Sequence, residues 1–205
     1  MTAENGRETE VKFYVRDLKK IEVRLLELKA HLIQPRVHEI NLRFDNPSGD
    51  LRRQFKVLRL RKDTEAKFTF KGPSEQRADG VLSRREIEFM VGDFEDAKQF
   101  LEILGFVPVV FYEKFRATHE LNGVHIMLDE LPYGEFVEIE GENVNSLRAV
   151  ARLLGLNWEA AIPIGYHRLF ESVAGKYNLD VSQLSFEAVK PVRVSAEDLN
   201  IVPAD

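Results

Sequence analysis

Eight short segments of this chain alternate charged and apolar residues, and the charged residues of each segment fall on one face. In the first segment Glu8, Glu10 and Lys12 share a face, because successive side chains of a strand point to opposite sides. The alternation therefore predicts eight β-strands, each with one polar and one apolar face. The predicted strands are residues 8–15, 37–45, 57–61, 66–71, 84–91, 112–119, 124–129 and 135–141.

Two arrangements of these strands are compatible with the pattern. A half-exposed sheet would hold its charges in water as salt-bridge ladders, whereas eight antiparallel strands can close into a barrel with a polar interior. Amphipathic helices at about 18–28 and 94–104, capped by Asp17 and Asp93, would cover the apolar outer faces of such a barrel. The pattern alone leaves both folds open.

The composition indicates one globular domain and argues against several classes of protein. A chain of 205 residues is long enough for a sizeable core, and no low-complexity linker divides it. The lack of cysteine excludes disulfides and thiolate nucleophiles and, with no signal peptide at the N-terminus, predicts a cytoplasmic protein. A net charge of −5 and no long apolar stretch predict that neither nucleic acid nor a membrane is a partner. We expect a single domain over residues 1–180 and a C-terminal extension, 181–205, whose role the sequence does not indicate.

The polar faces carry more acids and bases together than a solvated surface predicts. Buried charges are costly unless they are paired, hydrated or bound to a ligand, and a polyanion with a divalent cation would satisfy both signs. Arg and Lys on several strands can bind phosphate oxygens, and clustered carboxylates can hold Mg²⁺ or Mn²⁺. The bases are Lys12, Arg43, Arg59, Arg61, Lys67, Lys71, Arg84, Lys114 and Arg116. The acids are Glu8, Glu10, Glu86, Glu88, Asp129, Glu138 and Glu140.

Seven motifs in a fixed order give the chain a resemblance to a known family. They are Glu8-x-Glu10-x-Lys12, Leu58-Arg59-Leu60-Arg61, Phe68-Thr69-Phe70-Lys71-Gly72-Pro73, Arg84-x-Glu86-x-Glu88, Glu113-Lys114-x-Arg116, Leu128-Asp129 and Gly134-x-Phe136-Val137-Glu138-Ile139-Glu140. Together they resemble the CYTH family, or triphosphate tunnel metalloenzymes, which joins class IV adenylate cyclases with thiamine triphosphatases. The resemblance covers about residues 8–176, and the last motif with Tyr166-His167-Arg168-Leu169 is more similar to the cyclase-like branch.

The resemblance implies an α+β fold, namely a closed antiparallel eight-stranded β-barrel with helices packed on the outside. It implies Mg²⁺ or Mn²⁺ as the cofactor, held by a metal-binding set that consists of Glu8, Glu10, Asp129, Glu138 and Glu140. The phosphate-binding set is Lys12, Arg59, Arg61, Lys67, Lys71, Arg84, Lys114 and Arg116. Arg43, Glu86 and Glu88 would line the same tunnel with a less defined role.

The implied function is a metal-dependent reaction on a small-molecule triphosphate inside the barrel. An enzyme like class IV adenylate cyclase would convert ATP to cyclic AMP and pyrophosphate. A triphosphatase would instead hydrolyse tripolyphosphate or an organic triphosphate such as thiamine triphosphate. A third hypothesis, a non-catalytic polyphosphate- or nucleotide-binding module, is disfavoured because the metal-binding acids are all present. The sequence indicates no catalytic general base, does not decide between the two reactions, and leaves a homodimer open.

Overall fold

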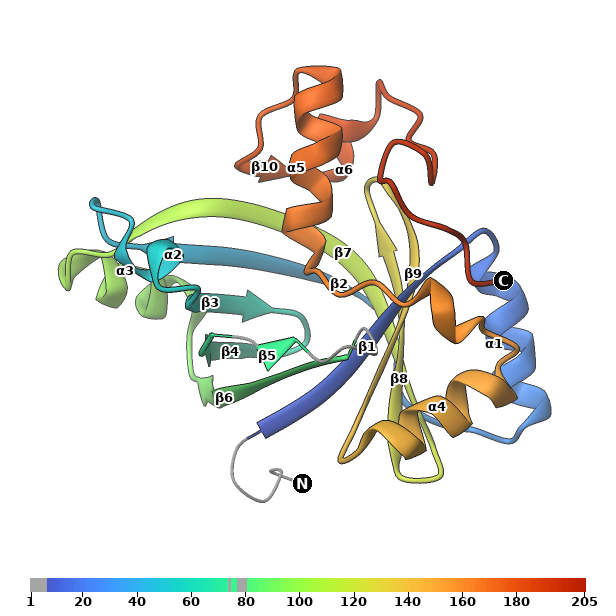
Figure 1. Cartoon of the computed structure of the whole chain (residues 1–205). Helices are drawn as coiled ribbons and strands as arrows, with labels where there is room; N and C mark the ends of the chain where they lie inside the picture. Colours follow the sequence, from blue (N-terminus) through green and yellow to red (C-terminus); the bar gives the residue numbers. More distant parts are fainter. Residues whose placement is uncertain (1–6, 74, 77–80) are drawn as a thin grey trace.

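Eight antiparallel strands close into a barrel in the computed structural model, which describes residues 7–73, 75–76 and 81–205 and, of residues 7, 8, 75 and 76, the backbone alone. Each strand pairs with the next around the ring, and β6 pairs back with β1 (Figure 1). The closed barrel confirms the predicted fold class. In ring order the strands are β1 (Arg7–Val15), β9 (Gly134–Gly141), β8 (Val124–Leu131), β7 (Val107–Leu121), β2 (His31–Asp45), β3 (Val57–Lys62), β4 (Ala66–Lys71) and β6 (Leu82–Val91). Outside the ring, β5 (Glu75–Gln76) pairs with β6, and β10 (Gln183–Leu184) runs parallel to β7.

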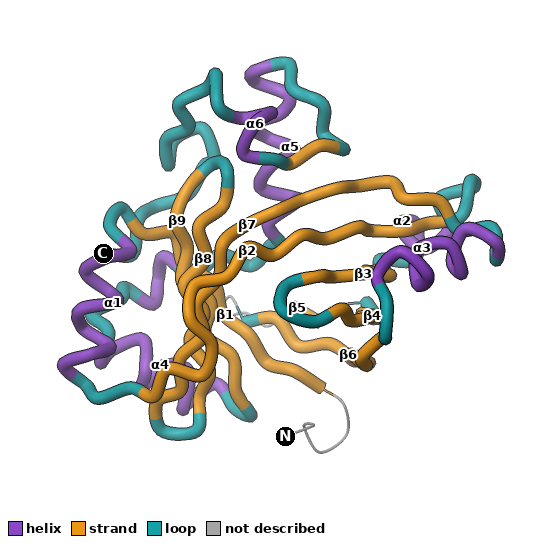
Figure 2. The backbone as a smooth tube through the Cα atoms, turned by 180° about the vertical axis from the view of Figure 1, so that it is seen from behind, coloured by secondary structure: helices purple, strands orange, loops and turns teal. Residues whose placement is uncertain are grey.

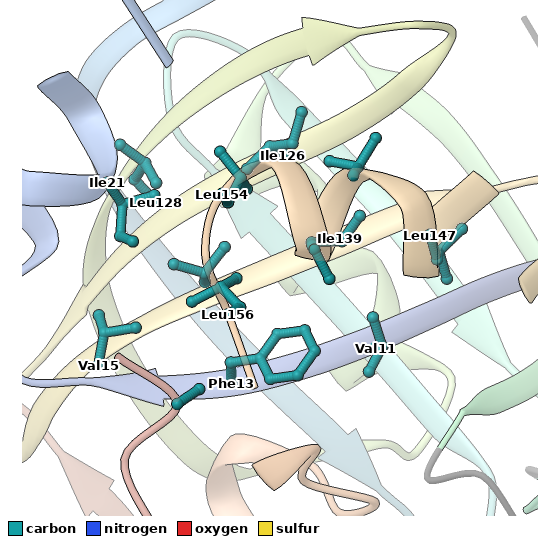
Figure 3. Close-up of a cluster of buried hydrophobic side chains, with 14 of the residues drawn as sticks. Val11, Phe13, Val15, Ile21, Ile126, Leu128, Ile139, Leu147, Leu154 and Leu156 are labelled. Carbon is teal, nitrogen blue, oxygen red and sulfur yellow. The ribbon is translucent and has the colours of Figure 1, made fainter. Parts of the chain in front are cut away.

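The apolar faces of β1, β8 and β9 pack against two helices, α1 (Leu18–Glu27) and α4 (Val144–Leu153). Figure 3 shows this core, in which Phe13 and Ile139 of the strands lie among side chains that include Leu147 of α4. All three of these residues are 0% exposed. Helix α1 begins where the sequence predicts, because the Asp17 side chain accepts a hydrogen bond from the Lys20 N–H.

A second core lies where α3 (Phe94–Ile103) covers the outer faces of β2, β3 and β4. Asp93 caps α3 as predicted, by accepting hydrogen bonds from the N–H groups of Glu95 and Asp96. A short helix, α2 (Asp50–Arg53), lies in the connection from β2 to β3. The buried members of this core are Phe44, Leu60, Ala66, Phe68, Phe94, Ala97 and Leu101.

A third core packs α5 (Tyr166–Tyr177) against the barrel, and the C-terminal extension belongs to it. Figure 1 shows α5, β10 and α6 (Phe186–Val189) grouped together beside β7. Phe170 of α5 stacks on Tyr133, and Leu184 and Leu199 of the extension are buried in the same cluster. A short 3₁₀ turn, η1 (Trp158–Ala160), precedes α5 in the chain. None of the helices in the described ranges is long and apolar enough to span a membrane.

Strands β2 and β7 are longer than predicted, with 15 residues each. Figure 2 shows the two strands running side by side along most of their length. Pro35 and Pro108 lie in the added parts, and proline cannot donate a hydrogen bond to a sheet, so both positions argue against a strand in the sequence. The pairing tolerates Pro35 because the register shifts between Gln34 and Val37.

The ring order decides which strands face each other across the barrel. Four steps around the ring separate β1 from β2 in either direction, and the same holds for β9 and β3. The pair β1/β9 therefore forms one wall of the barrel, and the pair β2/β3 forms the opposite wall.

Candidate functional site

The inward faces of the strands carry the charged residues, and the outward faces carry the apolar residues of the cores. On β1, Val11 and Phe13 belong to the core under α1 and α4 (Figure 3). The intervening residue Lys12 and the preceding Glu10 face the other side and are 3% and 6% exposed. The charged faces predicted from the alternation thus line the inside of the barrel.

Three carboxylates from β1 and β9 form an acidic cluster, which we define as Glu10, Glu138 and Glu140. One carboxylate oxygen of each lies within 4.8 Å of the others. Glu10 and Glu140 are directly opposite each other in the β1/β9 ladder, and Glu138 is opposite Lys12. The Lys12 ammonium lies 3.0 Å from Glu138 and 3.8 Å from Glu10. The Lys12 ammonium thus forms ion pairs with two of the carboxylates and none with the third, Glu140.

Glu140 carries the surplus negative charge of the acidic cluster. Among the described residues, no Lys, Arg or His nitrogen forms an ion pair with its carboxylate. Burial raises the pKa of Glu140 to about 7, and the neighbouring carboxylates of Glu138 and Glu10 add to the rise. Burial also acts to raise the pKa of Glu138, but the charges of Lys12 and Arg116 outweigh it and hold that pKa well below its usual value.

The acidic cluster fits a divalent metal ion such as Mg²⁺ or Mn²⁺. Both are hard cations that prefer oxygen ligands, and two paired strands present three carboxylates close enough to share one ion. Like charges directly opposite each other in a sheet are destabilising, so a bound cation would stabilise the Glu10/Glu140 pair. Glu8, which the sequence also predicts as a ligand, has its backbone in β1, but its side chain lies outside the described part of the chain.

Asp129 lies apart from the acidic cluster, among bases. Arg116 donates hydrogen bonds to both of its carboxylate oxygens, at 2.6 Å each, and Lys114 donates one at 3.2 Å. The Tyr166 hydroxyl donates another at 2.8 Å. Because Asp129 is 0% exposed and fully engaged, its geometry fits the positioning of Arg116 and Lys114. Its assignment as a metal ligand stays a prediction.

A group of bases from β3 and β4 surrounds Glu88 of β6, the strand that closes the ring against β1. Arg59 and Arg61 of β3 lie 3.8 Å and 3.5 Å from its carboxylate, and Lys67 of β4 lies 3.6 Å from it. The Nε atoms of Arg59 and Arg61 are buried and have no hydrogen-bond partner among the described residues. Arg59 therefore keeps an N–H donor that a phosphate oxygen could use, whereas the Arg61 Nε lies 3.6 Å from a carboxylate oxygen of Asp63.

The remaining predicted residues extend this basic surface toward the acidic cluster. Lys71 lies 2.6 Å from Glu86, and Arg84 donates a 3.4 Å hydrogen bond to Glu10. Arg84 thereby connects the basic surface with the acidic cluster. The barrel thus brings together the predicted phosphate-binding residues, with the carboxylates of Glu86 and Glu88 between them.

Glu39 and Tyr112 also belong to this interior, although the sequence-based site does not include them. Glu39 of β2 is 1% exposed, and it lies 3.6 Å from Lys114 and 3.8 Å from Arg61. The Tyr112 hydroxyl accepts a 3.3 Å hydrogen bond from Arg59. The alternation in 37–45 puts Glu39 on the polar face, so a sequence signal for it existed. The alternation in 112–119 also puts Tyr112 on the face of Lys114 and Arg116, but tyrosine suits either face of a strand, so this position did not stand out as a site residue.

Tyr166 reaches the interior from helix α5 rather than from a strand. Besides its bond to Asp129, its ring lies under the ammonium groups of Lys12 and Lys114, 4.6 Å and 5.3 Å from the ring centroid. Its backbone carbonyl accepts a hydrogen bond from the Tyr133 hydroxyl. The N-terminal end of α5 is therefore joined to the bases of both β1 and β7.

Comparison with known families agrees with this arrangement of acids and bases. A sequence profile of the CYTH domain matches residues 6–152, well over half of the chain. The chain belongs to the CYTH family. A comparison with curated proteins found no match. The matched residues include all eight strands of the barrel, so the CYTH domain and the barrel coincide, whereas α5 and the C-terminal extension lie beyond the profile.

Solved structures share the CYTH fold of this chain. One is a protein from Vibrio parahaemolyticus described as a candidate adenylate cyclase, with 20% identity and a TM-score of 0.73 over 82% of this chain and 99% of that one. Another is a protein from Pyrococcus horikoshii, with 29% identity and a TM-score of 0.64 over 78% and 96%. A third, from Hippeastrum, was named as an adenylyl cyclase and described as having a dominant triphosphatase activity; it shows 20% identity and a TM-score of 0.60 over 81% and 96%.

Proposed function

We propose that this CYTH protein is a divalent-metal-dependent triphosphatase, which hydrolyses inorganic triphosphate or an organic triphosphate inside the barrel. The observation that supports this best is that, among the described residues, a carboxylate without an ion pair, Glu140, and a guanidinium N–H without an acceptor, that of Arg59, lie on opposite walls of the barrel. The acidic cluster lies on the β1/β9 wall, and Arg59 and Arg61 lie on the opposite β2/β3 wall. A triphosphate between the walls would meet a metal site on one side and guanidinium groups on the other.

The residues of the chain would bind and orient the substrate. Arg59 and Arg61 would donate hydrogen bonds to phosphate oxygens, with Lys114 and Arg116 held in place by Asp129. A divalent cation bound at the acidic cluster would neutralise phosphate charge and polarise the phosphorus–oxygen bond. Hydrolysis by such an arrangement relies on positioning and on electrostatic stabilisation of the transition state.

A cyclase acting on ATP is the second candidate, and a specific observation favours it. The segment that ends in Glu138 and Glu140, together with Tyr166-His167-Arg168-Leu169, resembles the cyclase-like branch of the family. The structural relative from Vibrio parahaemolyticus is also described as a candidate adenylate cyclase. In the interior, however, the described aromatic groups already contact bases: Lys12 and Lys114 lie over the Tyr166 ring, and Arg59 is bonded to Tyr112. This arrangement favours recognition of the phosphates over recognition of adenine.

One experiment separates these reactions. The purified protein is incubated with tripolyphosphate or with ATP, each with Mg²⁺ or Mn²⁺, and the products are resolved by ion-exchange chromatography. We expect orthophosphate from tripolyphosphate in the presence of metal and none in EDTA. Cyclic AMP with pyrophosphate from ATP would instead identify a cyclase. Retained phosphate binding without any turnover would identify a binding module.

Matched variants test the metal site in the same assay. We expect Glu140→Gln to abolish turnover with either metal, because it removes one carboxylate of the acidic cluster. Glu142→Gln is the control, since Glu142 is exposed and follows the end of β9. Full activity of Glu140→Gln with both metals would show that the acidic cluster is not the metal site.

A further inference from the structure

Two arginines of like charge lie directly opposite each other on the inner face of the barrel. In the β2/β3 ladder, Arg43 is paired with Arg59. Like charges at directly opposed positions destabilise a sheet, as they do in the Glu10/Glu140 pair on the far wall. A divalent cation at the acidic cluster would offset the repulsion in the acidic pair. In the same way, a bound anion would offset the repulsion between the two arginines.

Arg59 has partners for its guanidinium group, but Arg43 does not. Arg59 donates hydrogen bonds to Tyr112 and Thr69 and lies 3.8 Å from Glu88. Within the described ranges, Arg43 forms neither a hydrogen bond nor an ion pair. Burial lowers the pKa of Arg43, and the charges of Arg59 and Arg52 lower it further, although Tyr112 and Glu171 oppose them. The half-buried Arg43 thus lies near other positive charges and has no carboxylate paired with it among the described residues.

Arg43 lies at the rim of the barrel, where a second base is close. Strand β2 ends two residues after Arg43, and α2, which carries Arg52, follows. Arg52 is 79% exposed at its side chain and reaches Glu171 of α5 at 3.5 Å. Glu171 is shared, because Arg168 forms an ion pair with it and His167 Nδ1 lies 3.7 Å away. One carboxylate at this rim therefore faces several bases.

We propose that Arg43 and Arg52 form an anion subsite at the rim of the barrel, which binds a phosphate group beyond the three that the interior holds. The ligand class is linear inorganic polyphosphate of four or more phosphates. This inference rests on the proposed function, because it extends the same substrate along the β2/β3 wall. A neutral nucleobase at this position would leave the repulsion between Arg43 and Arg59 in place, whereas a phosphate offsets it and accepts hydrogen bonds from both.

The test compares the binding of two polyphosphates that differ by one phosphate. Tripolyphosphate and tetrapolyphosphate are titrated into the protein by calorimetry in EDTA, so that no metal-dependent turnover occurs. We expect the wild-type protein to bind tetrapolyphosphate about tenfold more tightly, the effect of about one charge-assisted hydrogen bond. The double variant Arg43→Gln/Arg52→Gln should lose this preference, and its affinity for tripolyphosphate should change less than its affinity for tetrapolyphosphate.

Two further variants control for charge and for folding. Arg53→Gln makes the same charge change at the next residue of α2, where the side chain is engaged with Asp50, and it should keep the preference. Arg52→Gln alone alters an exposed side chain and should reduce the preference about threefold even if the double variant folds poorly. Equal affinity of the wild-type protein for both ligands, or loss of the preference in Arg53→Gln, would overturn the subsite alone. A wild-type protein that binds neither polyphosphate in EDTA would also overturn the subsite. The proposed function requires a metal ion, and it is overturned instead by a lack of tripolyphosphate turnover with Mg²⁺ and with Mn²⁺.

Discussion

Asp129 is the residue on which the arrangement of the interior bases depends most. Its carboxylate is fully buried and holds Arg116, Lys114 and the Tyr166 hydroxyl. We expect Asp129→Asn to lower the free energy of unfolding by about 3–5 kcal/mol, because two buried bases lose their nearest counter-charge. Urea unfolding of the metal-free protein measures this.

The exposed Arg36–Glu130 pair is the matched control for Asp129. It has the same bidentate geometry, with bonds of 2.6 Å and 2.8 Å, but its side chains are 52% and 35% exposed. Glu130→Gln should therefore change the free energy of unfolding by no more than about 1 kcal/mol. An equal decrease in the free energy of unfolding in the two variants would show that burial does not strengthen the interactions of Asp129.

For Glu140 we predict the opposite effect of a substitution, namely an increase in the free energy of unfolding. At pH 8, above its pKa of about 7, Glu140 is charged and lies opposite Glu10. Without metal, Glu140→Gln should raise the free energy of unfolding by about 0.2–1 kcal/mol, because it removes a repulsion between directly opposed carboxylates. With Mn²⁺, the wild-type protein should gain thermal stability, and the variant should gain little, since ligand binding stabilises only the state that binds. Differential scanning calorimetry with and without Mn²⁺ tests both parts, and an equal metal-induced shift in the variant would contradict them.

At the residue scale, the sequence predicts which residues are inside the barrel but not how they are paired. Alternation places Asp129 and Glu140 on the same face as the bases, and both are found there. Their different roles follow from register: β7 against β8 puts Arg116 opposite Asp129, and β1 against β9 puts Glu10 opposite Glu140. Register depends on strand ends and bulges far from these residues, so a single strand pattern cannot supply it.

At the scale of elements, the connection between β2 and β3 depends on one buried carboxylate. The residue before α2 is Gly49, which offers no side-chain cap, and Asp45 accepts hydrogen bonds from the N–H groups of Leu51 and Arg52 instead. We expect Asp45→Ala to lower the free energy of unfolding by about 1–3 kcal/mol at pH 6, because the backbone N–H groups at the start of α2 lose their acceptor. Ser48→Ala, at an exposed position of the same turn, should have little effect.

The effect of Asp45 should also depend on pH. Burial acts to raise its pKa, but the backbone hydrogen bonds from Arg52, Leu51 and Asn46 together lower it. A carboxyl group with a lowered pKa stabilises the fold above its unfolded pKa of about 3.9, and this contribution is lost as the pH falls toward the folded value. The difference between wild-type protein and Asp45→Ala should therefore shrink below about pH 4. Urea midpoints from pH 6 to pH 3 measure it, and a constant difference over that range would contradict the assignment.

The sequence predicts elements best where a local signal marks their ends. Asp17 and Asp93 cap helices that begin as expected, because a cap is a contact within one turn. Strands β2 and β7 extend past their predicted starts through Pro35 and Pro108, because pairing with a long neighbour outweighs the lost donors. The cost of a proline is local, but the compensating pairing comes from a strand more than 60 residues away in the chain, which no short sequence window includes.

At the scale of the whole molecule, the C-terminal extension is part of the CYTH barrel's support. Its backbone forms two of the bonds that fix it: the Ala204 N–H donates to the Tyr14 carbonyl, and the Ala204 carbonyl accepts from the Asn157 N–H. Backbone hydrogen bonds do not depend on which side chain a residue carries. The sequence of 181–205, with its mixed polarity, therefore did not indicate this packing. The eight strands were predictable from the alternation, but their closure into a barrel followed only from the family resemblance, because the alternation also suits a half-exposed sheet.

The extension should therefore stabilise the barrel through the core around α5. Leu199 is 3% exposed and shares that core with Phe170, whereas Val202 is 65% exposed. We expect Leu199→Ala to lower the free energy of unfolding by about 2–5 kcal/mol and Val202→Ala to change it by less than about 0.5 kcal/mol. Because α5 also carries Tyr166, which contacts Asp129, the loss should reduce the affinity for tripolyphosphate in Leu199→Ala and not in Val202→Ala. Urea unfolding and calorimetric titration of the two variants test this link, and unchanged stability in Leu199→Ala would show that the extension only lies against the barrel.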